Sequence, residues 1–245
     1  MYIPKEYEST DFSKQVALIR EYPLGVLFSS GTRKSGILQF ASQLYETKSP
    51  EVEMEASHIP FLFVESKDGK HKLIAHLARR NQLIDLLERS GKCLVVFQSV
   101  DSYISPSWYP LKKETHKFVP TWDFAAVHVY GTPKIIRDDK DWLINMLTLL
   151  TAQEEGKRPK GAEYEEKWKV SDAPESYLAI MLKNIVGIEI EIDSIQSKFK
   201  FDQKSPVVNV QGVIKNLLHE VGGDKGKGMA ALVKENYPTE FLPDS

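Results

Sequence analysis

A short segment that joins a predicted strand to a predicted helix carries the best-placed charges in the sequence. Residues 72–77 form the predicted strand, and Asn81 stands where it can cap a helix whose apolar positions begin at Leu83. Arg79 and Arg80 lie between the two elements. Free N–H groups at a helix start and arginine guanidinium groups both bind phosphate oxygens, so the junction predicts an anion site. The alternative is that both arginines are solvated and Asn81 only caps the helix, and spacing alone favours this alternative.

Two further segments could present a surface to a flat ligand. Residues 103–110 place hydroxyl groups and three aromatic rings between prolines, and such a rigid loop can offer hydrogen bonds and apolar surface. The alternative is a packed end of a barrel with Trp108 in the core, and both can hold together. In residues 119–131, which run into the strand predicted at 122–136, the small residues Ala125 and Ala126 allow a ligand or a second backbone to come close. Periodicity alone favours ordinary sheet packing there.

Other kinds of chemistry find no support in the spacing. The six histidines show no metal-ligand spacing, and His71 and His76, five residues apart on a predicted strand, point to opposite faces. Cys93 lies in an apolar strand, where cysteine is usually a packed core residue. The sequence has no serine elbow, no dinucleotide fingerprint and no nucleophile–base pair that spacing supports. We therefore predict no metal site and leave catalytic residues unassigned.

Composition limits the class of protein. The 245 residues carry a net charge of −2 with scattered basic residues, so binding to nucleic acid through charge has little support. A single cysteine rules out an intrachain disulfide and favours a reducing compartment. The first residues lack the apolar core of a signal peptide, and no apolar run approaches the ~20 residues of a membrane helix. We expect no membrane contact and a cytoplasmic location, with the nucleus left open.

The order of the predicted elements favours an α+β fold, in which antiparallel hairpins carry helices between and after them. Asp68 and Gly69 signal a hairpin turn. Residues 31–55 read as a long irregular hairpin connection with weak helical character near residues 40–45, and residues 194–201 as a second strand that could pair with residues 185–192. Glycine-rich residues 222–228 read as a flexible link between helices at 207–221 and 229–236. We predict a single domain over residues 1–245 with a C-terminal helical extension.

These same stretches resemble the PaiB family, a group of FMN-binding proteins often labelled negative transcriptional regulators. The most specific stretch is residues 119–131, and the others are residues 1–4, 57–60, 76–81, 103–109, 185–192 and 211–214. They cover nearly the whole chain in order. The resemblance implies an antiparallel, FMN-binding split β-barrel related to the pyridoxamine-phosphate oxidases, with helices appended to it. It also implies that two barrels pair as a homodimer and that FMN, the implied cofactor, lies at their interface.

The resemblance also implies which residues bind the flavin. The residues that would surround its phosphate and ribityl end are Ser57, His58, His76, Ala78, Arg79, Arg80 and Asn81. The residues that would approach the flavin, some from the partner subunit, are Ser107, Trp108, Thr121, Trp122 and Asp123. Lys200 and Gln203 match a Lys-x-x-Gln stretch of the family and complete the set.

The chain departs from the family pattern at positions that bear on this site. The family usually has asparagine where this chain has Asp123, and a carboxylate there would repel an anionic ligand. The serine and asparagine that flank Gln203 in the family are Asp202 and Lys204 here. The resemblance implies a flavin-dependent, oxidoreductase-like protein. A transcriptional regulator, direct or indirect, and a flavin sensor or carrier without turnover are the alternatives, and whether the protein is an enzyme stays open.

Overall fold

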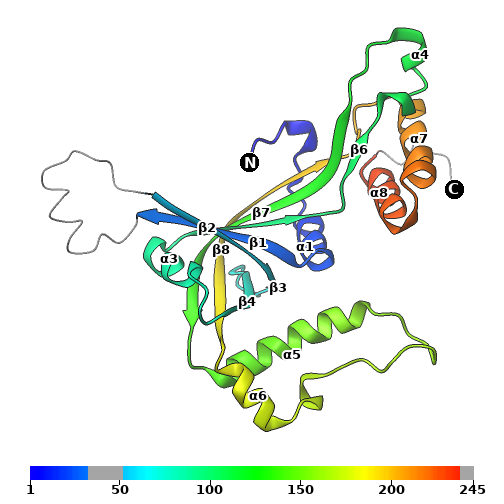
Figure 1. The fold of residues 1–245 in the computed structure, drawn as a ribbon. Helices are drawn as coiled ribbons and strands as arrows, with labels where there is room; N and C mark the ends of the chain where they lie inside the picture. Colours follow the sequence, from blue (N-terminus) through cyan, green and yellow to red (C-terminus); the bar gives the residue numbers. More distant parts are fainter. Residues whose placement is uncertain (33–51, 238–245) are drawn as a thin grey trace, which may run out of the picture. The chain divides into compact units, whose positions relative to one another are not determined.

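The structure, a computed structural model, describes residues 1–32 and 52–237 (Figure 1). Contacts divide the chain into two units. Unit 1 comprises Met1–Tyr22, Phe97–His128 and the residues from Gln196 onward, and unit 2 comprises Pro23–Val96 and Val129–Ile195. Strands β5 (Cys93–Gln98), β7 (Thr121–Ile136) and β8 (Ile185–Lys200) contribute residues to both units. The single domain expected from the sequence stays a prediction.

The strands belong to one sheet with the order β2-β1-β5-β7-β8-β4-β3, and β6 pairs with β7. The pairs β1–β2, β1–β5, β3–β4, β4–β8 and β6–β7 are all antiparallel. The predicted α+β fold, an antiparallel sheet with helices between and after its strands, is confirmed. The sheet also agrees with the split-barrel architecture that the family resemblance implies.

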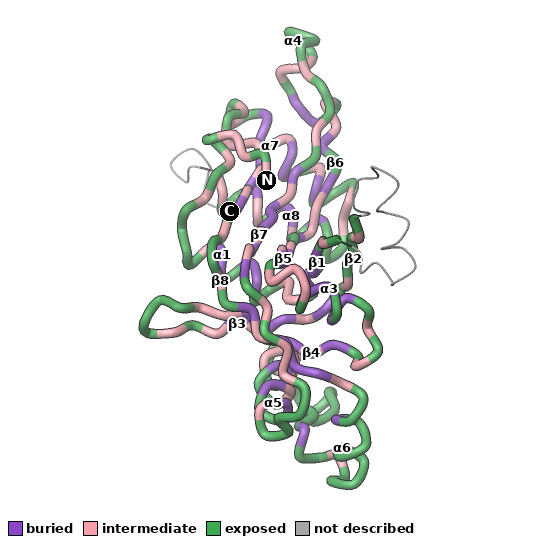
Figure 2. The backbone as a smooth tube through the Cα atoms, turned by 90° about the vertical axis from the view of Figure 1, so that its left-hand side faces the viewer, coloured by how far each residue is buried: buried purple, intermediate pink, exposed green. Residues whose placement is uncertain are grey.

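Unit 2 is built on two hairpins and the helices that follow them. A turn with Gly69 at a φ of 79° joins β3 to β4, as Asp68-Gly69 predicted. Helix α5 places Leu143, Met146 and Leu150 against Ile74 of β4 in a buried cluster. Much of α6 is exposed (Figure 2). The elements of unit 2 besides the shared strands are β1 (Leu24–Thr32), β2 (Val52–Pro60), β3 (Leu62–Val64), β4 (Lys72–Ala78), α3 (Leu83–Ser90), α5 (Lys140–Lys157), η3 (Val170–Asp172) and α6 (Glu175–Leu182).

Unit 1 combines the N-terminal helix, a short hairpin and the C-terminal helices. Asp11 caps the first helix as predicted, because its carboxylate accepts the Ser13 N–H at 2.9 Å. The C-terminal helices α7 and α8 contact each other, as Figure 1 shows. The elements of unit 1 besides the shared strands are η1 (Lys5–Tyr7), α1 (Phe12–Glu21), β6 (Ser102–Ile104), η2 (Pro106–Trp108), α4 (Lys112–Thr115), α7 (Val207–Asn216), η4 (Leu217–Val221) and α8 (Gly223–Asn236).

The structure corrects the glycine-rich link expected at residues 222–228. Helix α8 begins at Gly223, so most of this segment is helical. A Cβ added at Gly226 would lie 2.2 Å from the carbonyl oxygen of Leu217, so glycine allows α8 to pack directly against η4. Glycine costs about 1 kcal/mol relative to alanine inside a helix, and tertiary packing overrides that local preference.

Two strand predictions are also corrected. Residues 185–192 and 194–201 do not form two strands that pair with each other, because β8 runs without a break from Ile185 to Lys200. Asp193, which lies between the two predicted segments, is exposed and accepts a hydrogen bond from Lys92 at 2.8 Å. Within the segment 31–55, Gly31 and Thr32 belong to β1, and residues 52–55 belong to β2. The weak helical character expected near residues 40–45 lies outside the described residues.

Candidate functional site

In unit 2, the junction between β4 and α3 brings together residues from distant parts of the sequence. The side chain of Asn81 donates to the Ser57 hydroxyl of β2 at 3.1 Å and accepts the Leu83 N–H at 2.9 Å. Asn81 therefore caps α3, as predicted, and fixes the junction to the neighbouring hairpin. Gly91 ends α3 in the left-handed conformation, also as predicted.

The two arginines of this junction have different surroundings. Arg79 donates through its guanidinium to the main-chain carbonyls of Lys183 at 2.9 Å, Arg137 at 2.8 Å and Ile185 at 3.2 Å. It thus ties the end of β4 to the end of β7 and the start of β8. Arg80 is exposed, and its guanidinium makes no hydrogen bond or ion pair with the residues that the structure describes. The alternative that both arginines are solvated therefore holds for Arg80 and not for Arg79.

The remaining predicted residues of unit 2 lie around this junction. Ala78, the last residue of β4, is exposed and pairs with Ile185. His58 is exposed, one position after Ser57, and so lies on the opposite face of β2. His76 is half-buried, its Nδ1 has no hydrogen-bond partner among the described residues, and burial lowers its pKa. A neutral imidazole at this position adds no charge for a phosphate to bind.

In unit 1, Trp108 and Ser107 occupy the short helix η2. The indole of Trp108 is buried and donates to a carboxylate oxygen of Glu220 at 2.9 Å. A Cβ at Gly212 would lie 2.1 Å from the Trp108 carbonyl oxygen, so α7 packs closely against this loop. Trp108 is therefore a core residue, as the alternative had it, whereas Ser107 is exposed.

The ammonium group of Lys200 is engaged in contacts with neighbouring residues of the protein. It donates to the Thr121 hydroxyl and to the Trp122 carbonyl, both at 2.6 Å, and lies 3.5 Å from a carboxylate oxygen of Asp123. An ammonium group has three N–H donors, so this set uses its capacity. The Trp122 ring is 53% exposed and meets the Tyr103 ring edge-on, with 6.2 Å between centroids.

Asp123 is the most deeply buried of the predicted charged residues. Its exposed fraction is 0%, and neither carboxyl oxygen has a hydrogen-bond partner in the part of the chain that the structure describes. Burial and the neighbouring carboxyl group of Asp202 raise the pKa of Asp123 to about 8, although Lys200 acts in the opposite direction. The carboxyl group therefore holds a proton over a range of pH in which aspartate is usually ionised.

Residues that follow β8 complete this cluster. Gln203 accepts the Phe201 N–H at 2.8 Å and donates to the Phe199 carbonyl, so it closes the turn at the end of the strand. Asp202, in that turn, accepts from Tyr109 at 3.3 Å. Sequence reasoning noted Asp202 only as a departure from the family and gave Tyr109 no separate role. Their proximity to Asp123 depends on residues far apart in the sequence, so no local signal could have shown it.

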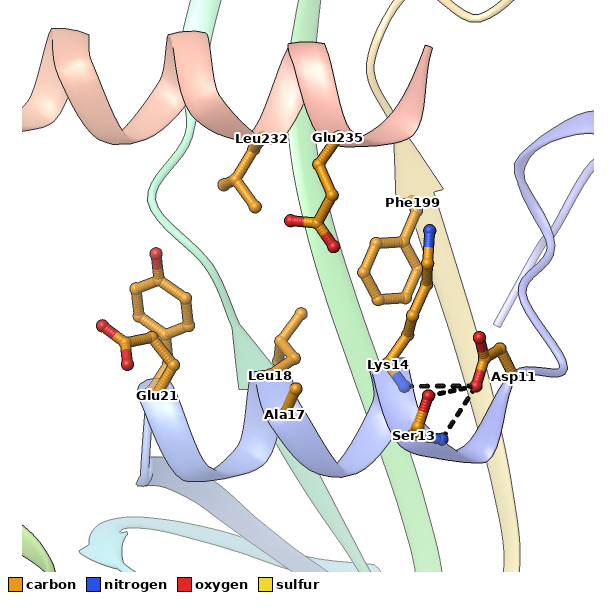
Figure 3. Close-up of a pocket in the computed structure, with 10 residues that line it drawn as sticks. Asp11, Ser13, Lys14, Ala17, Leu18, Glu21, Phe199, Leu232 and Glu235 are labelled. Carbon is orange, nitrogen blue, oxygen red and sulfur yellow. Dashed lines mark hydrogen bonds between the residues drawn. The ribbon is translucent and has the colours of Figure 1, made fainter. Parts of the chain in front are cut away.

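A groove in unit 1 contains none of the predicted site residues. It lies between α1 and α8, with a volume of about 640 Å³ (Figure 3). Leu18, Phe199 and Leu232 give it an apolar floor, and Glu235 points into it from α8. Within residues 1–32 and 52–237, no group of acidic, histidine or cysteine side chains could hold a metal ion. No helix there is long and apolar enough to cross a membrane.

The chain matches a known protein family over most of its length. Residues 1–194 match the family described as "Putative FMN-binding domain". The chain belongs to this FMN-binding family. The family description names FMN, which is the cofactor that the sequence predicted. Membership confirms the flavoprotein class.

Individual relatives extend the match along the chain. It is 62% identical over 167 residues to the Saccharomyces cerevisiae protein YKL070W, which covers 68% of this chain and 98% of the yeast protein. It is 28% identical to the Bacillus subtilis protease synthase and sporulation protein PAI 2, covering 98% of this chain and 100% of that protein. The predicted resemblance to the PaiB family is confirmed.

A solved structure also matches the chain. The FAD and heme binding protein from Mycobacterium smegmatis superposes with a TM-score of 0.49 and 16% identity, covering 79% of this chain and 73% of that chain.

Proposed function

We propose that this chain binds FMN and that Arg80, at the junction of β4 and α3, is the arginine that contacts the phosphate. The observation that supports this assignment is the contrast with Arg79, whose guanidinium already binds three main-chain carbonyls. Arg80 is exposed, with no partner among the described residues. A guanidinium in this state can make bidentate, charge-assisted hydrogen bonds to phosphate oxygens without breaking a bond inside the protein.

The neighbouring residues would position this arginine and complete the phosphate contacts. Arg79 would hold the junction in place through its carbonyl contacts, and its direct contact with FMN stays a prediction. The Ser57 hydroxyl lies 3.1 Å from Asn81 and is half-buried, so its own hydrogen can be donated to an anion. The residues present therefore suit the phosphate end of FMN.

In unit 1, the exposed face of the Trp122 ring would offer an apolar surface to an isoalloxazine ring. Aromatic rings stack on planar ligands and contribute about 0.5–1.5 kcal/mol beyond the area they bury. When bound, FMN supplies the redox chemistry, and the protein supplies orientation and electrostatics. This division suits a chain without a nucleophile–base pair. We therefore favour an oxidoreductase-like flavoprotein over a regulator that contacts DNA.

We also propose that the protein forms a homodimer through the open face of the β1–β2 hairpin. Leu24 is 60% exposed, Val52 65% and Met54 75%. The register Leu24↔Pro60, Ser30↔Met54 and Thr32↔Val52 places these side chains on one face, together with Phe28 and His58. Exposed apolar side chains gathered on one face commonly mark a protein interface. Ser57 lies on the other face of this hairpin, where it contacts Asn81, so the interface and the proposed phosphate site would lie on opposite faces of β2.

The first experiment is an absorbance spectrum of the purified protein, followed by mass spectrometry of the cofactor released on denaturation. We expect flavin bands and the mass of FMN. Arg80→Ala should weaken FMN binding by tenfold or more, since a charge-assisted hydrogen bond to a phosphate contributes about 1.5–3 kcal/mol. Lys134→Ala, which removes an exposed cation from β7, is the matched control. Colourless protein that does not bind added FMN would refute the proposal.

Two further measurements separate the finer alternatives. Reduction of the bound flavin by NADH or NADPH would favour an oxidoreductase, whereas flavin that is bound but not reduced by either would favour a sensor or carrier. Sedimentation equilibrium of the wild type and of Met54→Asp tests the homodimer, because a carboxylate on the exposed apolar face should shift the mass toward that of the monomer. Binding to promoter DNA that weakens steeply with salt would support the regulator instead.

A further inference from the structure

A pocket of unit 1, beside the loop that contains η2, is lined by basic side chains. It has a volume of about 410 Å³, within the range of roughly 300–1,000 Å³ that is usual for small-molecule pockets. No acidic residue lines it, so the pocket presents positive charge and hydrogen-bond donors to a ligand. The lining residues are Ser107, Trp108, Tyr109, Pro110, Lys112, Lys113 and His116.

The short helix α4 and the turn that ends it place the basic residues around this pocket. Lys112 and Lys113 begin α4, and His116 follows it with a φ of 52°, in the left-handed region that histidine adopts more readily than most residues. The His116 N–H donates to the Lys112 carbonyl at 2.9 Å, which closes the turn. The imidazole therefore lines the same pocket as the two lysines, although α4 is only about one turn long.

The positive charge of this segment is not neutralised by the part of the chain that the structure describes. Residues 112–117 contain three lysines and one histidine against one glutamate. None of these three lysines forms an ion pair with a described residue. Like charges that gather on one surface repel each other and destabilise the fold, so an unpaired basic cluster around a pocket favours an anionic ligand.

The neighbouring polar groups leave this pocket open to an anion. The Ser107 hydroxyl accepts from the Lys112 ammonium group at 3.4 Å, so its own hydrogen can be donated to a ligand. Two carboxylates contact the aromatic residues of the pocket, Glu220 at the Trp108 indole and Asp202 at the Tyr109 hydroxyl, at 2.9 and 3.3 Å. Neither carboxylate lines the pocket itself.

We propose that this pocket binds the phosphate group of a ligand other than FMN. A phosphate monoester carries close to two negative charges at neutral pH and three strong acceptor oxygens. It therefore matches two ammonium groups, an imidazole and a hydroxyl better than a carboxylate, which has a single charge. That the ligand is not FMN rests on the proposed function, because FMN has a single phosphate and the proposal assigns that phosphate to Arg80.

The test uses inorganic pyrophosphate as the probe, titrated calorimetrically into the full chain at low ionic strength and in excess FMN. We expect the double variant Lys112→Gln/Lys113→Gln to bind pyrophosphate at least about tenfold more weakly than the wild type, since both ammonium groups are lost. The matched control is Lys227→Gln/Lys234→Gln, which removes two exposed ammonium groups from α8 and should bind within about twofold of the wild type. No binding by the wild type, or equal losses in the two double variants, would overturn the inference.

Titrations with FMN separate this pocket from the proposed FMN site. The variant Lys112→Gln/Lys113→Gln should bind FMN within about twofold of the wild type, whereas Arg80→Ala should bind FMN more weakly and keep its affinity for pyrophosphate. A tenfold loss of FMN affinity in the lysine variant would assign the pocket to the phosphate of FMN itself and refute the inference. If pyrophosphate binding depends on the two lysines but no form of the chain binds FMN, the proposed function fails and the phosphate pocket stands.

Discussion

The two groups of predicted flavin-binding residues differ in where their charged groups lie, at the surface in one group and buried in the other. At the junction of β4 and α3, the guanidinium of Arg80 stays in water, and that of Arg79 donates to main-chain carbonyls and lies 3.6 Å from the Asp138 carboxylate. In unit 1, Asp123 is fully buried beside Asp202, with one ammonium group, that of Lys200, in ion-pair contact. Removing a charge from water is costly unless it is paired or neutralised. The first region therefore offers an available charge, whereas the second contains a charge that must be compensated within the protein.

A large effect should come from removing Lys200, the cation in ion-pair contact with Asp123. Lys200→Met leaves the carboxyl pair without its counter-charge, and we expect a loss of about 3 kcal/mol in the free energy of unfolding at alkaline pH. The loss should be smaller under acidic conditions, where the carboxyl groups are protonated. Urea denaturation at two pH values measures both. Lys204→Met, which breaks the more exposed ion pair with Glu6, should cost less than about 1 kcal/mol. Equal losses in the two variants would contradict the contrast between buried and exposed charges.

The next effect concerns the pH dependence of stability. The pKa of Asp123 is raised in the folded protein from 3.8 to about 8, so between these values the folded state holds a proton that the unfolded state has lost. Stability contributed by this group should therefore fall as the pH rises through that window, by up to about 1.4 kcal/mol per pH unit. Denaturation curves for the wild type and Asp123→Asn provide the measurement, and the variant should lack this slope. A wild-type protein that grows more stable across the same window, relative to the variant, would disprove the assignment.

A smaller effect should separate the two adjacent arginines. Arg79→Ala removes hydrogen bonds that join three strand ends, and we expect it to lower the free energy of unfolding by about 1.5 kcal/mol, a value reduced because the side chain is partly exposed. Arg80→Ala should change stability by less than about 0.5 kcal/mol, as most exposed positions do. Thermal or urea unfolding without FMN compares them, and FMN titration should rank them in the opposite order. If Arg79→Ala leaves stability unchanged, its carbonyl contacts do not hold the junction.

The smallest effect should come from the cap of α3. Asn81→Ala removes the acceptor of the Leu83 N–H and should cost about 1 kcal/mol of stability. Asn81→Asp keeps the capping oxygen and is the matched control, which should retain most of that stability. Urea denaturation of both variants tests the cap. A loss of the same size in both would point to the bond with Ser57 as the stabilising contact instead.

Several features followed from the sequence because their causes are local. Asn81 caps α3, Gly91 ends it, and Asp11 caps α1, each through bonds to residues a few positions away. The antiparallel fold and the family also followed, since alternating apolar residues and ordered motifs extend over most of the chain. The sequence placed Trp108 in a loop but left open whether its ring contacts a ligand or packs in the core. Its hydrogen bond to Glu220 shows that it packs in the core.

Other features depended on tertiary structure. The glycine-rich residues that we predicted to be a link form the start of α8, because Gly226 packs against η4 more closely than any side chain allows. Arg79 and Arg80 are adjacent and of the same type, so the sequence does not distinguish them. The structure does, because Arg79 donates to carbonyls at the end of β7 and the start of β8. Asp123 and Asp202 are far apart in the chain, and Asp123 becomes buried only when the strands and helices of unit 1 meet. The sequence by itself determined which groups can ionise, whereas burial and the proximity of other charges determined which of them keep their protons.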